Sequence, residues 1–149
     1  MSTIEKSIEV YVPLYVAYNQ WTSCDEYPRF MEGVKEVKWL GAKRYHWKAK
    51  IAGQNPEWDA EITEQTEHQR LAMTYRSGAI KGWVATFHKL SKDWSKVTLQ
   101  LEYDPQGFVE NVGDASEVVA SRVQRDLERF KSFIENRGGS SPFADWQMM

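Results

Sequence analysis

The order of the predicted elements constrains the fold of this chain most. One strand and a short helical stretch come first, a run of strands with alternating apolar residues follows, and a long amphipathic helix over residues 108–137 comes last. A late helix after a strand-rich segment has to cover one face of a curved antiparallel sheet. The pattern predicts an α+β domain in which an apolar cavity lies between the sheet and this helix.

The alternation of apolar and polar residues predicts seven strands, and helical spacing predicts two short helices after the first of them. Leu14, Ala17, Tyr18 and Trp21 follow Pro13 at helical spacing, and Ser23 could cap the second short helix, with Glu26 as its capping-box partner. The predicted strands cover residues 4–12, 34–40, 44–52, 55–64, 70–76, 82–90 and 95–104.

The third and fourth strands can be placed in register. Gly53-Gln54 between them is typical of a type II′ turn. Pairing across that turn sets Lys50 opposite Glu57, Lys48 opposite Asp59 and His46 opposite Glu61, which gives a charge-matched outer face. The inner face of the same register is apolar: Tyr45, Trp47, Ala49, Ile51, Trp58, Ala60 and Ile62.

Length and charge limit the classes of function. The 149 residues predict one domain over residues 1–137 and a flexible tail over residues 138–149. The net charge is -2 and the basic residues alternate with acidic ones, so nucleic-acid binding is not expected. No apolar run is long enough for a membrane span, so no stable membrane insertion is expected, and the lone Cys24 is typical of a reducing cytoplasm.

The histidines, carboxylates and nucleophilic residues of the sequence do not predict a metal or cofactor site. His46, His68 and His88 are dispersed and do not have metal-ligand spacing. The carboxylates of residues 57, 59 and 61 are interpreted as a solvated strand face that pairs with Lys48, Lys50 and Arg76. No phosphate-binding loop or nucleophile motif is present, so neither a cofactor nor a catalytic residue is assigned.

The inner face carries the candidate ligand-binding residues. Their rings combine apolar area with a hydroxyl or indole N–H that needs a partner when buried, which suits a flat or greasy ligand with one polar end. The candidates are Tyr45, Trp47, Trp58, Tyr75, Trp83 and Tyr103 from the strands, with Asn111 and Ser116 from the last helix.

Five segments of the chain share one family pattern: Ile8-Glu9-Val10-Tyr11-Val12-Pro13, Tyr27-Pro28-Arg29-Phe30-Met31, Trp58-Asp59-Ala60-Glu61-Ile62-Thr63, Val84-Ala85-Thr86-Phe87 and Asp126-Leu127-Glu128-Arg129-Phe130-Lys131. They resemble bacterial polyketide cyclase/dehydrase-type proteins of the START-like (SRPBCC) superfamily, and the resemblance covers about residues 3–137. The resemblance implies a helix-grip fold, in which a seven-stranded antiparallel sheet wraps around the C-terminal helix and encloses a hydrophobic cavity. Its relatives include aromatic polyketide cyclases, ubiquinone-binding proteins and lipid-transfer domains.

Three functions remain open at this point. The first is a non-catalytic binder or carrier of a small hydrophobic molecule such as a lipid, a quinone or a polyketide-like aromatic. The second is a cyclase or dehydratase that uses a tyrosine as proton donor or acceptor. The third is a protein-interaction module that docks through its grooved surface or through the C-terminal tail, where Phe143 and Trp146 are unexpectedly apolar.

Overall fold

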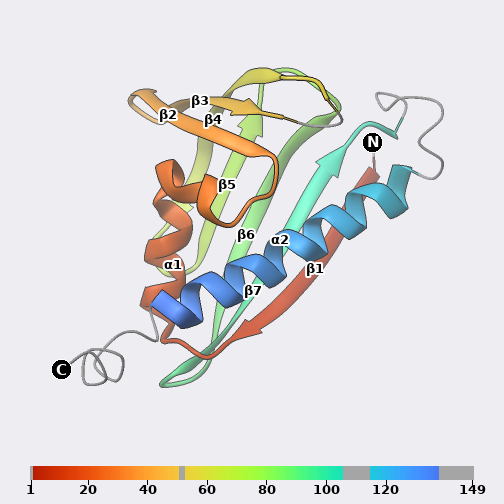
Figure 1. The fold of residues 1–149 in the computed structure, drawn as a ribbon. Helices are drawn as coiled ribbons and strands as arrows, with labels where there is room; N and C mark the ends of the chain where they lie inside the picture. Colours follow the sequence, from red (N-terminus) through yellow and green to blue (C-terminus); the bar gives the residue numbers. More distant parts are fainter. Residues whose placement is uncertain (1, 51–52, 106–114, 138–149) are drawn as a thin grey trace.

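A computed structural model describes residues 2–50, 53–105 and 115–137. Seven antiparallel strands form one curved sheet in the order β1-β7-β6-β5-β4-β3-β2, and a long helix lies across its inner face (Figure 1). The predicted fold class is therefore confirmed. The strands are β1 (Ser2–Val10), β2 (Val34–Gly41), β3 (Arg44–Ala49), β4 (Glu57–Thr66), β5 (Arg70–Tyr75), β6 (Ile80–Ser91) and β7 (Trp94–Tyr103).

Three helical segments accompany the sheet: α1 (Leu14–Thr22), η1 (Cys24–Arg29) and α2 (Ala115–Arg137). Helix α1 begins directly after Pro13, as predicted. The predicted capping role of Ser23 is wrong, because its hydroxyl donates backward to the carbonyl oxygen of Asn19 at 2.8 Å and η1 has no side-chain cap. The predicted start of the last helix, residues 108–114, lies outside the described residues.

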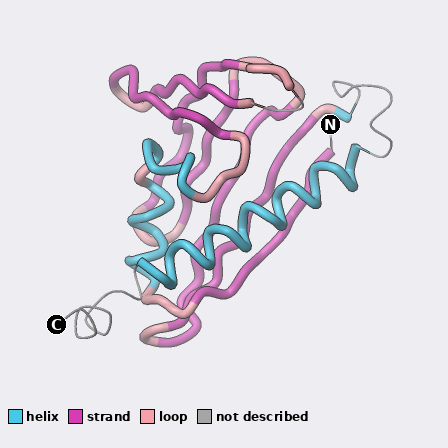
Figure 2. The backbone as a smooth tube through the Cα atoms, viewed as in Figure 1, coloured by secondary structure: helices cyan, strands magenta, loops and turns pink. Residues whose placement is uncertain are grey.

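The sheet brings the beginning and the end of the strand series together. β1 pairs with β7, and Ser2 and Val10 lie opposite Tyr103 and Ser95. β2 is the other edge strand, so α1 and η1 carry the chain from one edge of the sheet to the other (Figure 2). This crossing places both short helices beside α2 on the inner face.

The hydrophobic core lies between the inner face of the sheet and the helices. Trp83, Ala85 and Phe87 alternate with outward residues along β6, and all three are buried as predicted. Phe130 of α2 meets the ring of Trp21 edge to face, with centroids 4.9 Å apart. The buried stripe of α2 comprises Val119, Val123, Leu127, Phe130 and Ile134, which confirms its predicted amphipathic pattern over the described residues.

The predicted register of β3 and β4 is wrong by two residues. His46 lies opposite Asp59 and Trp47 opposite Trp58, whereas the charge-matched pairing placed His46 opposite Glu61. Pro56 has no N–H to donate to a ladder, and its carbonyl oxygen instead accepts a hydrogen bond from the backbone of Ala49 at 3.0 Å. β4 therefore begins after the proline. A shift of two residues keeps every side chain on its predicted face.

Strands β5 and β6 approach each other closely at Gly82. A Cβ at this position would lie 2.4 Å from the carbonyl oxygen of Met73, which is much closer than two such atoms can approach. The sheet also has an irregular register between Ile80 and Gly82. Only glycine therefore allows the two strands to lie this close, directly before Trp83 on the inner face.

Candidate functional site

The predicted aromatic surface is present at the β3–β5 end of the inner face. Trp47 and Trp58 lie opposite each other on β3 and β4, and their rings stack with centroids 5.6 Å apart. The ring of Tyr75 on β5 lies 5.3 Å from each of them. Trp47 is buried, whereas Trp58, Tyr75 and Tyr45 are half-buried, so the cluster reaches from the core to the surface.

The aromatic cluster continues into the centre of the core through rings that were not among the predicted ligand-binding residues. Tyr27 of η1 lies 5.4 Å from the ring of Trp47 and 6.2 Å from that of Trp83. Its hydroxyl donates to the carbonyl oxygen of Trp21 at 2.6 Å, and the Cys24 thiol lies 3.4 Å from the same hydroxyl. In the sequence, the only indication of this part of the cluster was that Trp21 lies on the apolar stripe of α1.

The hydrogen bonds of the cluster are incomplete. The indole N–H of Trp83 donates to the hydroxyl oxygen of Tyr75 at 3.0 Å. In the described part of the chain, the buried indole nitrogens of Trp21, Trp47 and Trp58 have no hydrogen-bond acceptor. Because an unmatched buried donor costs about 1–3 kcal/mol, these three groups lower stability as they stand. They are also donors that an acceptor oxygen could satisfy.

The tyrosines of the cluster remain protonated over the physiological pH range. Burial raises the pKa of Tyr45 to about 12. Burial also raises the pKa of Tyr75, and the negative charge of Asp126 adds to this effect, while the hydrogen bond from Trp83 opposes it. The pKa of Tyr27 is raised by burial as well. These hydroxyls therefore act as hydrogen-bond donors rather than as phenolate bases.

The remaining predicted site residues lie apart from the stacked tryptophans or outside the described part of the chain. Tyr103 is buried at the end of β7, where it pairs with Ser2 and Ile80 across the neighbouring strands. Asn111 lies outside the described residues. Ser116 belongs to the first turn of α2, but its side chain is not among those described.

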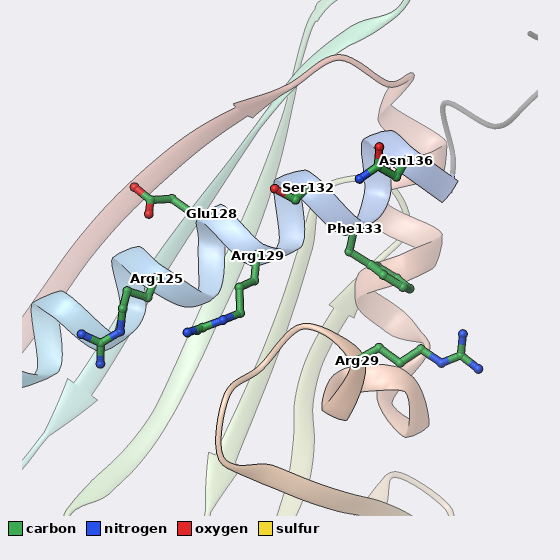
Figure 3. Close-up of a pocket in the computed structure, with 7 residues that line it drawn as sticks. All are labelled: Arg29, Arg125, Glu128, Arg129, Ser132, Phe133 and Asn136. Atoms are coloured by element: carbon green, nitrogen blue, oxygen red, sulfur yellow. The ribbon is translucent and has the colours of Figure 1, made fainter. Parts of the chain in front are cut away.

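The hollows at the surface of the described residues include three that neither Trp47 nor Trp58 lines. The first has a volume of about 690 Å³ between η1 and α2, and Arg29, Arg129 and Phe133 are part of its lining (Figure 3). The second, of about 340 Å³, lies beside α1, and the third, of about 380 Å³, lies along β4–β7. The predicted internal cavity therefore stays a prediction.

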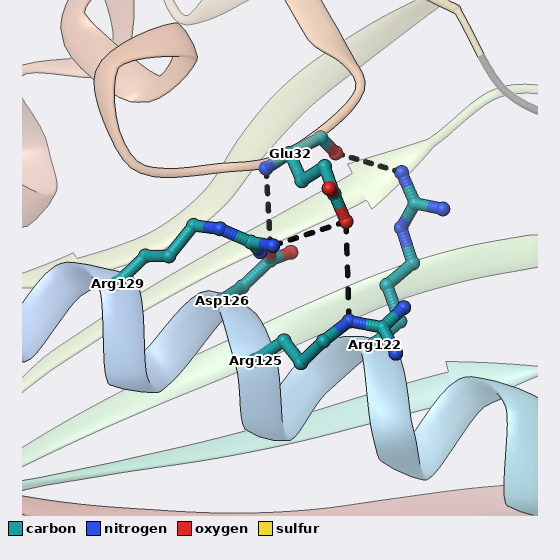
Figure 4. A network of polar contacts seen from close by, with 5 residues as sticks. All are labelled: Glu32, Arg122, Arg125, Asp126 and Arg129. Carbon is teal, nitrogen blue, oxygen red and sulfur yellow. Dashed lines mark hydrogen bonds and ion pairs between the residues drawn. The ribbon is translucent and has the colours of Figure 1, made fainter.

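A polar network beside the first hollow joins the turn after η1 to α2 (Figure 4). The backbone N–H of Glu32 donates to the Asp126 carboxylate at 3.2 Å, and Arg122 donates to the carbonyl oxygen of Glu32 at 2.9 Å. Arg129 pairs with the Glu32 carboxylate at 3.1 Å and with Asp126 at 3.3 Å. Burial raises the pKa of Asp126 to about 6, although the Glu32 N–H and the two arginines oppose this shift.

The outer face of β3 and β4 carries the acidic run that the sequence interpreted as solvated. His46 bridges the run, with its two ring nitrogens 2.7 Å from Asp59 and 2.8 Å from Glu57. Glu61 pairs with Arg76 at 2.9 Å, as expected, whereas Lys48 pairs with Glu36 rather than with a carboxylate of β4.

No group of three potential metal ligands occurs among the described residues. None of the described helices is long and apolar enough to cross a membrane.

Comparison with known proteins places these observations in a family. The family model described as "Polyketide cyclase / dehydrase and lipid transport" matches residues 10–131. An uncharacterized 17.2 kDa protein of Streptomyces lincolnensis is 45% identical over 139 residues, which cover 93% of each chain.

Solved structures with low sequence identity share the fold. The Zhui aromatase/cyclase from Streptomyces sp. R1128 matches with a TM-score of 0.72 at 12% identity, over 93% of this chain and 94% of its own. A START superfamily protein from Mycobacterium smegmatis matches with a TM-score of 0.72 at 14% identity, over 91% and 95% of the two chains. On the family match and the Streptomyces relative, the chain belongs to the polyketide cyclase/dehydrase and lipid transport family.

Proposed function

We propose that this protein binds a small hydrophobic ligand with a planar ring system and acceptor oxygens, as a non-catalytic binder or carrier. The ligand contacts the aromatic cluster of β3–β5, with Trp47, Trp58 and Tyr75 at its centre and Tyr45 at the exposed edge. The observation that carries this proposal is the pair of stacked indoles whose N–H groups have no acceptor in the described part of the chain. A carbonyl oxygen of the ligand would satisfy such a donor.

Binding requires a local rearrangement. The indole nitrogen of Trp58 is covered although its ring is half-buried, so a ligand reaches it only when a neighbouring ring shifts. The half-buried ring of Tyr75 lies 5.3 Å from that of Trp58, so a shift of Tyr75 would open a path to this nitrogen. The low polarity of the cluster strengthens a hydrogen bond once the ligand excludes water.

A matched pair of ring compounds tests the proposal. Anthraquinone-2-sulfonate carries two carbonyl oxygens, and anthracene-2-sulfonate has the same ring system and charge without them. We expect the quinone to bind roughly fivefold more tightly in calorimetric titrations, because one neutral hydrogen bond contributes about 1 kcal/mol. Trp58→Phe should remove most of this preference, whereas Trp94→Phe, at the distant β6–β7 turn, should keep it. Equal affinities for the two compounds, or no binding of either, would contradict the proposal.

A cyclase or dehydratase-type enzyme is the second candidate, and Asp126 favours it. A carboxyl group with a pKa of about 6 can exchange a proton near neutral pH, and its charge acts on Tyr75 in the cluster. Solved structures of the same fold include the di-domain aromatase/cyclase BexL, with a TM-score of 0.74 at 19% identity, over 91% of this chain and 47% of that one. If a substrate is turned over, Asp126→Asn should abolish turnover and leave ring-compound binding in place. Unchanged turnover in this variant would exclude the carboxyl group as the proton carrier.

We also propose a location for the protein in the cell. A cytoplasmic location is supported by Cys24, which is a free thiol buried in the core. Docking of a protein partner through residues 138–149 stays a prediction, because the tail lies outside the described residues.

A further inference from the structure

The turn of the β2–β3 hairpin carries two large apolar side chains on the protein surface. Trp39 is 62% exposed and Leu40 is 44% exposed, whereas Val37, two residues earlier on the same strand, is buried. The hairpin forms one corner of the molecule at the edge of the sheet (Figure 1). Trp39 and Leu40 are consecutive residues of a strand, so their side chains leave opposite faces of the hairpin, and an apolar layer that takes up the hairpin end-on would cover both.

The hairpin holds the indole ring in this exposed position. The N–H of Trp39 donates to the carbonyl oxygen of Ala42 across the turn at 2.9 Å. Gly41 and Ala42 both have positive φ angles, 114° and 50°, and the register of the two strands shifts between Trp39 and Gly41. The ring can therefore enter an apolar environment without an unmatched donor, unlike the indoles of the aromatic cluster.

Basic side chains surround the two apolar ones. Lys38, Lys43 and Arg44 are exposed, and residues 38–44 contain no acidic residue, although the whole chain has a net charge of -2. None of these three cations forms an ion pair with a described residue. Glu61, opposite Arg44 on β4, pairs with Arg76 at 2.9 Å instead. The turn is thus a local positive patch with an apolar centre.

We propose that this hairpin docks the protein reversibly on the surface of an anionic lipid bilayer. Trp39 and Leu40 enter the region between headgroups and acyl chains, where tryptophan side chains are stable, and Lys38, Lys43 and Arg44 contact the anionic headgroups. A nucleic acid would need a broader positive surface than the three cations of this turn provide. This inference does not depend on the ligand of the aromatic cluster.

Vesicle co-sedimentation of the full chain tests the proposal. We expect binding to vesicles of phosphatidylcholine mixed with phosphatidylserine, weak binding to phosphatidylcholine alone, and loss of binding at high salt. Neutralising Lys43 and Arg44 to glutamine should weaken binding roughly fivefold for each charge, since a cation near such a surface contributes about a factor of five. The double variant Trp39→Ser/Leu40→Ser should reduce binding at least as strongly.

A matched control uses the exposed apolar residues at the other end of the sheet. Leu90 and Trp94 are 41% and 36% exposed, and Leu90→Ser/Trp94→Ser should keep full vesicle binding. Circular dichroism and urea unfolding establish that each variant is folded. The proposal is overturned if the full chain does not bind anionic vesicles, or if Trp39→Ser/Leu40→Ser and Leu90→Ser/Trp94→Ser lose vesicle binding equally. Binding to single-stranded DNA or to a protein, without binding to vesicles, would also overturn it. Binding of the anthraquinone probe is measured separately and is unaffected by any of these outcomes.

Discussion

Asp126 makes the stability of the protein depend on pH in an unusual direction. Its carboxyl group is 16% exposed under the turn that contains Glu32, and burial raises its pKa from 3.8 to about 6. The charges that face it are those of Arg122, Arg129 and Glu32. Because the folded state holds this proton more tightly than the unfolded state, the free energy of unfolding falls as the pH rises from about 4 to about 6.

The size of the effect follows from the difference between the two pKa values. A shift from 3.8 to about 6 is about two units, and one unit corresponds to about 1.4 kcal/mol. Asp126 therefore contributes about 3 kcal/mol to stability below pH 4, and this contribution is lost as the pH rises through about 6.

The substitution Asp126→Asn isolates this contribution. The amide does not titrate, and its oxygen can still accept the hydrogen bond from the Glu32 N–H. We expect the difference in unfolding free energy between wild type and variant to change by roughly 2 kcal/mol between pH 4 and pH 7, because the unfolded carboxyl is already partly ionised at pH 4, with the variant relatively more stable at pH 7. Urea unfolding at a series of pH values, followed by tryptophan fluorescence, measures this difference.

A control variant and a clear negative outcome complete the experiment. Asp93→Asn removes the same charge in the exposed turn between β6 and β7, away from the network, and should keep the wild-type pH profile. Parallel curves for wild type and Asp126→Asn between pH 4 and pH 7 would refute the argument that burial controls this carboxyl group.

Three further predictions concern the sheet, the core thiol and the outer face. Gly82→Ala should lower the free energy of unfolding by about 2–4 kcal/mol, because the strands must separate to admit the Cβ. Gly78→Ala, where the Cβ meets open space, should cost only about 1 kcal/mol, and equal losses would contradict the steric argument.

Burial raises the pKa of the Cys24 thiol, so a disulfide reagent should label it slowly in the folded protein and rapidly in urea; rapid labelling of the folded protein would be inconsistent with this. The hydrogen bond from His46 to Asp59 raises the pKa of the imidazole above 6.5, so its stabilisation is present below that pH and is lost as the pH rises through the folded-state pKa. Proton NMR of Asp59→Asn should show a lower pKa for His46, and an unchanged value would exclude this cause.

Side-chain direction was predictable from the sequence because a strand has a period of two. Trp83 and Phe87 had to share a face once β6 was recognised, and both are buried. The register of β3 and β4 was not predictable by the same means. Glu57, Asp59 and Glu61 repeat every two residues, so a shift of two positions again places an acidic side chain opposite Lys48 and leaves the faces unchanged. Charge matching could not separate these two registers.

The contacts that position the candidate site join residues that are far apart in the sequence, so no local sequence pattern predicts them. Glu32 and Asp126 are 94 residues apart in the sequence, and neither has a neighbour that signals their hydrogen bond. The rings of Trp47 and Trp58 were correctly assigned to one face. Their missing acceptors depend on how each ring is rotated within the cluster, which alternation does not fix.

The composition of the aromatic cluster supports the proposed ligand binding. A phenylalanine in place of Trp47 or Trp58 would provide a large ring without the cost of burying an unmatched N–H. The indole nitrogens therefore add donors that the core does not need. Tyr75 accepts a hydrogen bond from Trp83 and, because its pKa is raised, keeps its own proton to donate. Once a neighbouring ring shifts, as the proposed binding requires, these donors would suit a flat ligand with acceptor oxygens better than a saturated hydrocarbon chain, which could satisfy none of them.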